Sequence, residues 1–181
     1  GHEVALLDAC APHAPKDHAA IRAQAEGFDL VGLHVKTLHV QPAYELARAL
    51  AGLPLVAGGP HATIVPDELL AHGFRWVIRG EGEDALVELA DAIAPGRRSG
   101  EDALGGDNPF ASIAGLSWLD RGLPRHNPPR GFITDLDRLA PPLAALDLFD
   151  PAWYGATATL PPAGLLSSRG CPAACTFCSN D

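Results

Sequence analysis

Short apolar runs alternate with stretches of helical spacing through the first half of the chain. Four runs have the length of a buried strand, at residues 4–9, 29–35, 53–57 and 75–79. The run at 53–57 ends in a Gly-Gly-Pro cluster that would close the strand. Strands that alternate with helices predict a parallel α/β sheet over this part of the chain.

Three helices are expected between and after these strands. Residues 66–72 predict a short one, and the other two have apolar residues recurring at i, i+3, i+4 and i+7, the spacing of one helix face. The stripe of the first comprises Ala43, Leu46, Ala47 and Leu50, and that of the last comprises Leu86, Leu89, Ala90 and Ile93.

Polar or glycine-rich segments follow three of the predicted strands. Ligands of parallel α/β sheets bind beyond the carboxyl ends of the strands, so these segments are candidate binding sites. Glycines there lack a Cβ, which lets the backbone approach a ligand closely or adopt a positive φ. The candidate binding residues are His34, Thr37, Gly58, Gly59, His61, Gly80, Glu81 and Gly82.

Structural roles remain open for these candidates. For Gly58 and Gly59, the alternative to ligand contact is that they only end a strand. Glu81 and its acidic neighbours Glu83 and Asp84 would stabilise a helix N-terminus by about 0.3 to 1 kcal/mol each, a role as well supported as ligand contact. The two histidines fit equally well as polar residues at a pocket rim.

The second half has weaker patterning. Residues 95–110 are rich in glycine and proline and predict a linker. Two runs at 112–119 and 123–126 flank Asp120-Arg121-Gly122, which predicts a β-hairpin. A last strand is expected at 164–168, directly before a cluster of cysteines.

That cluster, Cys171, Cys175 and Cys178, has the spacing CxxxCxxC. Thiolates hold iron-sulfur clusters, and three of them on a 4Fe-4S cluster leave one iron open for a small molecule. A zinc site usually takes four Cys or His ligands, and no second cysteine pair is present. Structural disulfides need an oxidising compartment and a more dispersed set. We therefore favour a 4Fe-4S cluster over zinc or a disulfide.

Charge and hydropathy restrict the partners. The formal net charge of -9 argues against a nucleic-acid-binding surface, because such surfaces carry a basic patch. No stretch has the apolar length that crosses a bilayer, so no membrane span is expected. Cytoplasmic localisation is the default expectation.

The cysteine run from Arg169 to Cys178, with Phe177 before the last cysteine, resembles the signature of the radical S-adenosylmethionine (SAM) superfamily. The resemblance implies that SAM completes the shell of the open iron and is cleaved to a 5′-deoxyadenosyl radical. It further implies a small-molecule substrate and an electron donor such as flavodoxin or ferredoxin. Phe177 would then lie near the adenine of SAM, although a packing role explains this aromatic residue equally well.

A second resemblance covers nearly the whole chain. Residues 29–33, 58–61 and 79–83, followed by 115–118, 127–130, 135–137 and 147–150, resemble in order the cobalamin-binding domain and linker of cobalamin-dependent radical SAM enzymes. This implies a flavodoxin-like sheet whose candidate binding residues contact cobalamin. Methylation of an unactivated carbon is the leading implied reaction. Radical cyclisation, rearrangement and a non-catalytic corrinoid or iron-sulfur carrier remain alternatives.

The same resemblance divides the chain into a cobalamin-binding domain (1–94), a linker with a hairpin (95–160) and the start of a radical SAM domain (161–181). The run at 4–9 would be the second strand of the sheet, so the first strand and any cobalt-ligating DxHxxG loop would precede residue 1. With that central strand absent, 4–9 would be displaced or would pair with 29–35. The isolated chain would then be poorly stable and inactive.

Overall fold

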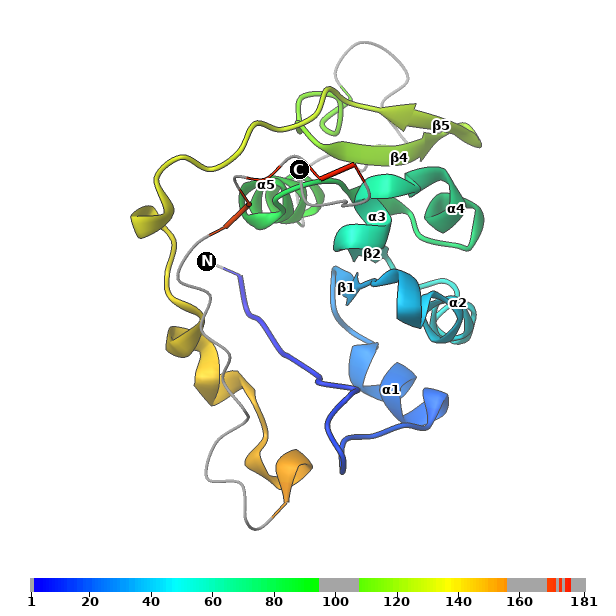
Figure 1. Cartoon of the computed structure of the whole chain (residues 1–181). Helices are drawn as coiled ribbons and strands as arrows, with labels where there is room; N and C mark the ends of the chain where they lie inside the picture. Colours follow the sequence, from blue (N-terminus) through cyan, green and yellow to red (C-terminus); the bar gives the residue numbers. More distant parts are fainter. Residues whose placement is uncertain (1, 95–107, 156–168, 172, 174, 177–181) are drawn as a thin grey trace. The chain divides into compact units, whose positions relative to one another are not determined.

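The computed structural model describes residues 2–94, 108–155, 169–171, 173 and 175–176 (Figure 1). These residues belong to two compact units. The first consists of His2 and Pro15–Leu139, and the second of Glu3–Ala14 and the residues from Ala140 onward. Most of the predicted linker at 95–110, the strand predicted at 164–168, and both Phe177 and Cys178 lie outside the described residues.

A five-stranded mixed sheet forms the first unit, in the order β1-β2-β3-β4-β5. The three predicted strands that follow residue 28 are confirmed, and they pair in parallel. The predicted hairpin is also confirmed, and it extends the same sheet because its first strand pairs antiparallel with β3. The strands are β1 (Val31–His34), β2 (Leu55–Gly58), β3 (Trp76–Ile78), β4 (Leu116–Asp120) and β5 (Leu123–His126).

Helices flank the strands, and the predicted ones are confirmed with shifted ends. Two α-helices of the described residues were not predicted: α1, which begins after the capping carboxylate of Asp17, and α3, where the sequence suggested only a loop. The short 3-10 helices η1 and η2 were not predicted either. The helices of this unit are α1 (His18–Ala25), η1 (Thr37–His39), α2 (Val40–Ala49), α3 (Pro60–Ile64), α4 (Pro66–Ala71), α5 (Glu83–Ile93) and η2 (Leu136–Arg138).

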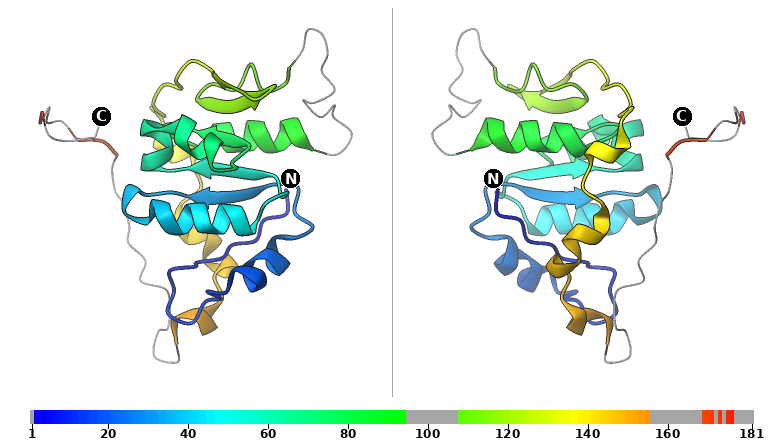
Figure 2. Two further views of the ribbon diagram at one scale, coloured as in Figure 1. Left: turned by 90° about the vertical axis from the view of Figure 1, so that its right-hand side faces the viewer. Right: turned by 90° about the vertical axis from the view of Figure 1, so that its left-hand side faces the viewer.

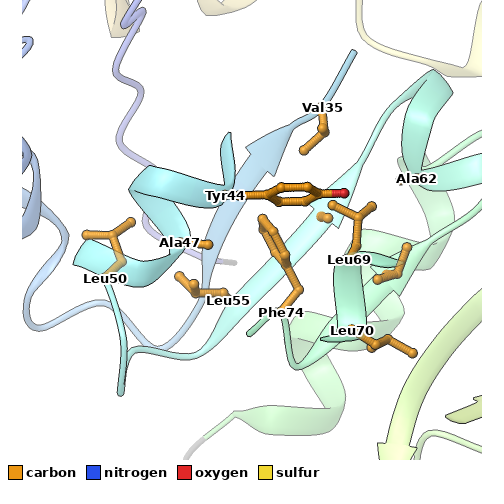
Figure 3. Close-up of a cluster of buried hydrophobic side chains, with 11 residues drawn as sticks. Val35, Tyr44, Ala47, Leu50, Leu55, Ala62, Leu69, Leu70 and Phe74 are labelled. Atoms are coloured by element: carbon orange, nitrogen blue, oxygen red, sulfur yellow. The ribbon is translucent and has the colours of Figure 1, made fainter. Parts of the chain in front are cut away.

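Each face of the sheet carries its own hydrophobic core. On one face, α2 and α4 pack over the sheet through residues such as Tyr44 and Leu69, together with Phe74 from the turn before β3 (Figure 3). On the other face, α5 packs through Leu89 against Trp76 and its neighbours. Burial of each large apolar side chain stabilises the fold by about 1.5 to 3 kcal/mol.

The core stripe predicted for the last helix is partly wrong. Leu89 is fully buried as expected, but Leu86 is 45% exposed and Ala85 is buried in its place. The buried residues of α5 are Ala85, Leu89 and Ala92, so the helix turns small side chains toward the sheet. Two alanines flanking one leucine let the helix lie close to the large indoles of the neighbouring strands.

The hairpin turn follows directly from its sequence. Arg121 and Gly122 both have positive φ, at 52° and 79°. This is the backbone of a two-residue type I′ turn, whose twist matches that of the two strands it joins. The turn sets the register in which Trp118 of β4 pairs with Arg125 of β5, and on its other side Trp118 pairs with Trp76 of β3.

The strand predicted at residues 4–9 is wrong. Residues 2–8 form no ladder, and Val4 and Leu6 are 61% and 37% exposed. A strand is stable only when another strand satisfies its backbone groups, and among the described residues none pairs with the outer edge of β1. The apolar run alone therefore did not produce a strand.

Residues 3–14 instead belong to the second unit, with η3 (Pro142–Leu148) and η4 (Pro151–Tyr154). The Tyr154 hydroxyl donates a hydrogen bond to the Asp8 carboxylate at 2.7 Å. The His13 amide donates to the Trp153 carbonyl at 2.9 Å. These two bonds join segments that are far apart in the sequence.

Candidate cofactor site

The three parallel strands point the same way, so their carboxyl ends lie together at one end of the sheet. Figure 2 shows the strands stacked one above another, with the hairpin as the last layer. Backbone bonds join the segments that follow β1 and β2. The Val35 amide donates to the Gly58 carbonyl at 2.7 Å, and the His61 amide donates to the Val35 carbonyl at 3.2 Å. Two of the three candidate binding segments therefore form one continuous surface.

Gly59 is the tightest point of this surface. Its φ is 104°, and a Cβ there would lie 2.9 Å from the Val35 carbonyl oxygen as well as against the His34 ring. His34 itself is exposed at the end of β1. Partial burial, together with the charge of Lys36, holds the pKa of His34 below its usual value, so its imidazole is neutral at pH 7.

His61 has a different environment, because it is buried with only 6% of its surface exposed. Its Nδ1 lies 3.2 Å from the Thr37 hydroxyl, and its Nε2 lies 3.5 Å from the Tyr44 hydroxyl and 4.0 Å from a Glu68 carboxylate oxygen. Burial, followed by hydrogen bonding to Glu68, raises the pKa of Tyr44. Both ring nitrogens of His61 thus have polar neighbours.

This polar group, in which only Tyr44 and His61 are buried, ties together four elements on one face of the sheet. Thr37 comes from η1, Tyr44 from α2, His61 from α3 and Glu68 from α4. The Tyr44 ring also stacks on His72, with ring centroids 3.7 Å apart. His61 is therefore placed to hold the two binding segments in shape.

The third segment, after β3, contains one open position. Gly80 has φ 76°, and no atom lies within 4 Å of the site of a Cβ there. Its amide donates to the Thr63 hydroxyl at 2.9 Å, which connects it to α3. Thr63, the fourth residue of α3, was not among the predicted site residues, because nothing in the sequence beyond its ordinary polarity singled it out.

Glu81 and Gly82 lie beside this open position but contact other parts of the protein. The Glu81 carboxylate accepts a hydrogen bond from the Ile133 amide. A Cβ at Gly82 would lie 3.4 Å from the Ile78 side chain. Of the candidate residues, His34, Thr37 and Gly80 are exposed, and Thr37 also interacts with buried His61.

Two of the candidate glycines have space beside them at this end of the sheet. Nothing lies within 4 Å of a Cβ built on Gly58 or Gly80. Leu38, in η1, is an apolar side chain that is 91% exposed.

The cysteine motif is described in part. Cys171 and Cys175 are exposed free thiols, and Gly170 before them has φ 77°. Thiol donors suit an iron-sulfur cluster, and Cys178, the third predicted ligand, lies outside the described residues together with Phe177. Within the described part of the chain, no helix is long and apolar enough to span a bilayer.

Comparisons with known proteins agree with the cobalamin interpretation. Residues 1–90 match the B12 binding domain family. An uncharacterized methyltransferase of Pyrococcus horikoshii is 31% identical over 185 residues, which cover 99% of this chain and 37% of the relative. The hopanoid C-3 methylase of Methylococcus capsulatus is 32% identical over 190 residues, which cover 99% of this chain and 33% of that protein.

The chain thus spans about a third of the length of these relatives. A solved structure, the radical S-adenosylmethionine methyltransferase TsrM from Kitasatospora setae with cobalamin and a 4Fe-4S cluster bound, is 24% identical. It covers 68% of this chain and 22% of that one, with a TM-score of 0.49. The predicted resemblance is confirmed for the B12-binding part: residues 1–90 belong to the B12-binding domain family, in a chain whose relatives are methyltransferases.

Proposed function

We propose that the chain is the cobalamin-binding and cluster-bearing part of a radical SAM enzyme that methylates an unactivated carbon. One observation carries the proposal. A single stretch of sequence joins a B12-binding domain to a CxxxCxxC motif, and methyltransferases align with 99% of it.

In this proposal the flavodoxin-like edge of the sheet holds cobalamin. Gly58 and Gly80 present open backbone, and Gly59 lets the His34 ring lie against the segment after β2. The contact between His61 and Thr37 holds together the segments that follow β1 and β2. Bound cobalamin would supply a carrier for the methyl group, and the cluster would supply an electron for cleavage of SAM.

The cysteine loop would hold that cluster. Each thiolate of Cys171, Cys175 and Cys178 would ligate one iron, and the fourth iron would be left for SAM. Phe177 would lie near the adenine of SAM. A flavodoxin or ferredoxin would reduce the cluster, the substrate would be a small molecule, and the enzyme would work in the cytoplasm.

The test uses the full-length protein, purified and reconstituted without oxygen. We expect the visible spectrum of bound cobalamin, about four irons per chain, and 5′-deoxyadenosine from SAM after reduction. Cys175→Ser should lose the iron and SAM cleavage while keeping cobalamin. Cys10→Ser is the matched control, because Cys10 is also an exposed free cysteine but lies outside the motif, and it should keep all three properties.

The outcomes separate the alternatives. Bound cobalamin without SAM cleavage would favour a non-catalytic carrier, and SAM cleavage without methyl transfer would favour a cyclase or a rearrangement enzyme. A protein that binds a single zinc ion, or a cluster whose spectrum does not respond to SAM, would overturn the proposal.

A further inference from the structure

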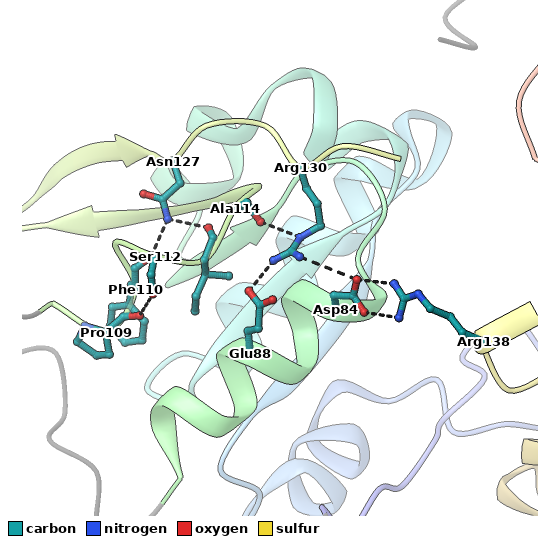
Figure 4. Close-up of polar contacts among 10 residues, drawn as sticks. Asp84, Glu88, Pro109, Phe110, Ser112, Ala114, Asn127, Arg130 and Arg138 are labelled. Carbon is teal, nitrogen blue, oxygen red and sulfur yellow. Dashed lines mark hydrogen bonds and ion pairs between the residues drawn. The ribbon is translucent and has the colours of Figure 1, made fainter. Parts of the chain in front are cut away.

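The segment that leaves the hairpin, residues 128–139, is bound along α5, and we call it the connector. Arg130 is its first contact, with a side chain only 17% exposed. The guanidinium donates from Nε to the Ala114 carbonyl at 3.2 Å and from Nη2 to Glu88, while Nη1 lies 3.9 Å from Asp84 (Figure 4). All three nitrogens of one mostly buried side chain therefore have a partner.

Arg138 binds α5 at the other end of the connector. Its two terminal nitrogens donate to the two oxygens of Asp84, at 3.0 and 2.6 Å. This paired geometry fixes the orientation of both groups, unlike a single contact between two charges. Asp84 thus receives cations from both ends of the connector, and Figure 4 shows it between the two arginines.

Between these two arginines the backbone of the connector is also held. The Ile133 amide donates to the carboxylate of Glu81, in the segment after β3. Glu81 was predicted as a cofactor contact because it follows a strand of the parallel sheet. In the structure its carboxylate faces the connector.

The start of the connector is fixed as well. The Gly115 amide donates to the Pro128 carbonyl at 2.8 Å, and Arg79 donates to the Asn127 carbonyl. The Asn127 side chain in turn donates to the carbonyls of Phe110 and Ile113. The connector therefore leaves the sheet from a rigid point beside the segment that follows β3.

An isolated ion pair at a surface contributes little to stability, so charge alone would not give these contacts a role. Here one mostly buried arginine, a doubly bonded pair and a hydrogen bond from the backbone act on the same short segment. Together they fix its path. That segment is the part of the chain that leads from the B12-binding domain toward the cysteine motif.

We propose that Glu81 and Asp84 are positioning residues that latch the connector onto the segment after β3 and onto α5, and so fix where the chain departs toward the cysteine motif. The functional part of this inference rests on the proposed function. Glu81 then acts through the connector and does not contact cobalamin.

Hydrogen exchange of the Ile133 amide in the full-length protein tests the latch directly. In Glu81→Ala the amide loses its acceptor and should exchange roughly three- to tenfold faster, the factor that corresponds to one hydrogen bond. Glu81→Gln keeps a carbonyl oxygen and should retain most of the protection. Arg125→Gln is the matched control, because it removes an exposed ion pair with Asp120 on the hairpin and should leave Ile133 unchanged.

Two further measurements separate positioning from cofactor contact. In Glu81→Ala and Asp84→Asn, the cobalamin Kd should stay within about twofold of the wild-type value while the rate of methyl transfer falls. A clearly higher cobalamin Kd in Glu81→Ala would mean that Glu81 touches the cofactor and would overturn the positioning role. So would unchanged exchange at Ile133, or faster exchange with full methyl transfer.

The latch and the proposed function fail in different ways. A wild-type protein that does not bind cobalamin or transfer methyl groups would refute the proposed function. The exchange of Ile133 would still decide whether the latch exists, because it is measured without any cofactor.

Discussion

A Cβ on Gly59 would lie 2.8 Å from Cδ2 of the His34 ring and 2.9 Å from its Nε2, so the two residues pack more closely than any side chain at Gly59 allows. The φ of 104° at Gly59 adds backbone strain for every other residue. Gly59→Ala should therefore lower the free energy of unfolding by about 1 to 3 kcal/mol. Chemical denaturation of the full-length protein checks this.

Gly58→Ala is the control for that experiment. Gly58 has an ordinary φ, and nothing lies within 4 Å of a Cβ there. Its substitution should change the free energy of unfolding by less than about 0.5 kcal/mol. Equal losses in the two variants would show that the His34 contact is not the cause.

His61→Ala should destabilise the protein more than His34→Ala. His61 is buried, and its removal leaves the hydroxyls of Thr37 and Tyr44 without their ring partner. Loss of a buried polar partner costs about 1 to 3 kcal/mol. His34 is exposed, so His34→Ala should cost well under that amount, and thermal unfolding of both variants without cobalamin compares them.

The same pair of variants separates structural from binding roles. If His61 holds the binding segments in shape, cobalamin should bind the His61→Ala variant more weakly in proportion to its loss of stability. A stable His61→Ala protein that has lost only cobalamin affinity would show instead that the ring contacts the cofactor.

The Tyr154–Asp8 bond predicts an unusual tyrosine titration. Burial, then the hydrogen bond to Asp8 and its charge, raise the pKa of Tyr154 to about 12. Because the pKa of Tyr154 is higher in the folded than in the unfolded protein, the protonated phenol stabilises the fold. This stabilisation is complete below the unfolded pKa of about 10 and is lost as the pH rises through about 12. The measurement is the tyrosinate absorbance of the wild-type protein minus that of Tyr154→Phe, recorded just after a rapid rise in pH. This difference should appear near pH 12.

Asp8→Asn tests the cause of that shift. It removes the charge and weakens the acceptor, so the Tyr154 titration should move down toward pH 10. An unchanged titration would mean that the bond to Asp8 does not hold the phenol.

Local sequence signals were enough for much of the fold. The apolar runs of β1, β2 and β3 are bounded by breakers, and each formed a strand close to its predicted position. Asp120-Arg121-Gly122 predicted the hairpin because two residues with positive φ are a local requirement of its turn. The cysteine spacing was also a local signal, and the cluster that it predicts at Cys171, Cys175 and Cys178 remains a prediction.

Features that depend on distant partners could not be predicted in this way. The run at residues 4–9 is apolar like the true strands, but strand formation depends on a paired neighbour that periodicity does not report. His61 follows a strand and so looked like a binding residue, yet Tyr44 and Glu68 come from other helices and surround its ring. Glu81 likewise meets Ile133, from a segment 52 residues away.

The latch should loosen in acid. Hydrogen bonds from Arg138, together with the charges of both arginines, hold the pKa of Asp84 below its usual value. A depressed pKa contributes stability above the unfolded value of about 3.9, and that contribution disappears as the pH falls through the folded pKa. Between about pH 5 and pH 2, exchange at Ile133 should therefore rise relative to its intrinsic rate, with a midpoint below 3.9.

In Arg138→Gln the midpoint should shift upward, because Asp84 has lost its paired donor, whereas Arg125→Gln should leave it in place. A midpoint that is the same in all three proteins would mean that Asp84 does not control how tightly the connector is held.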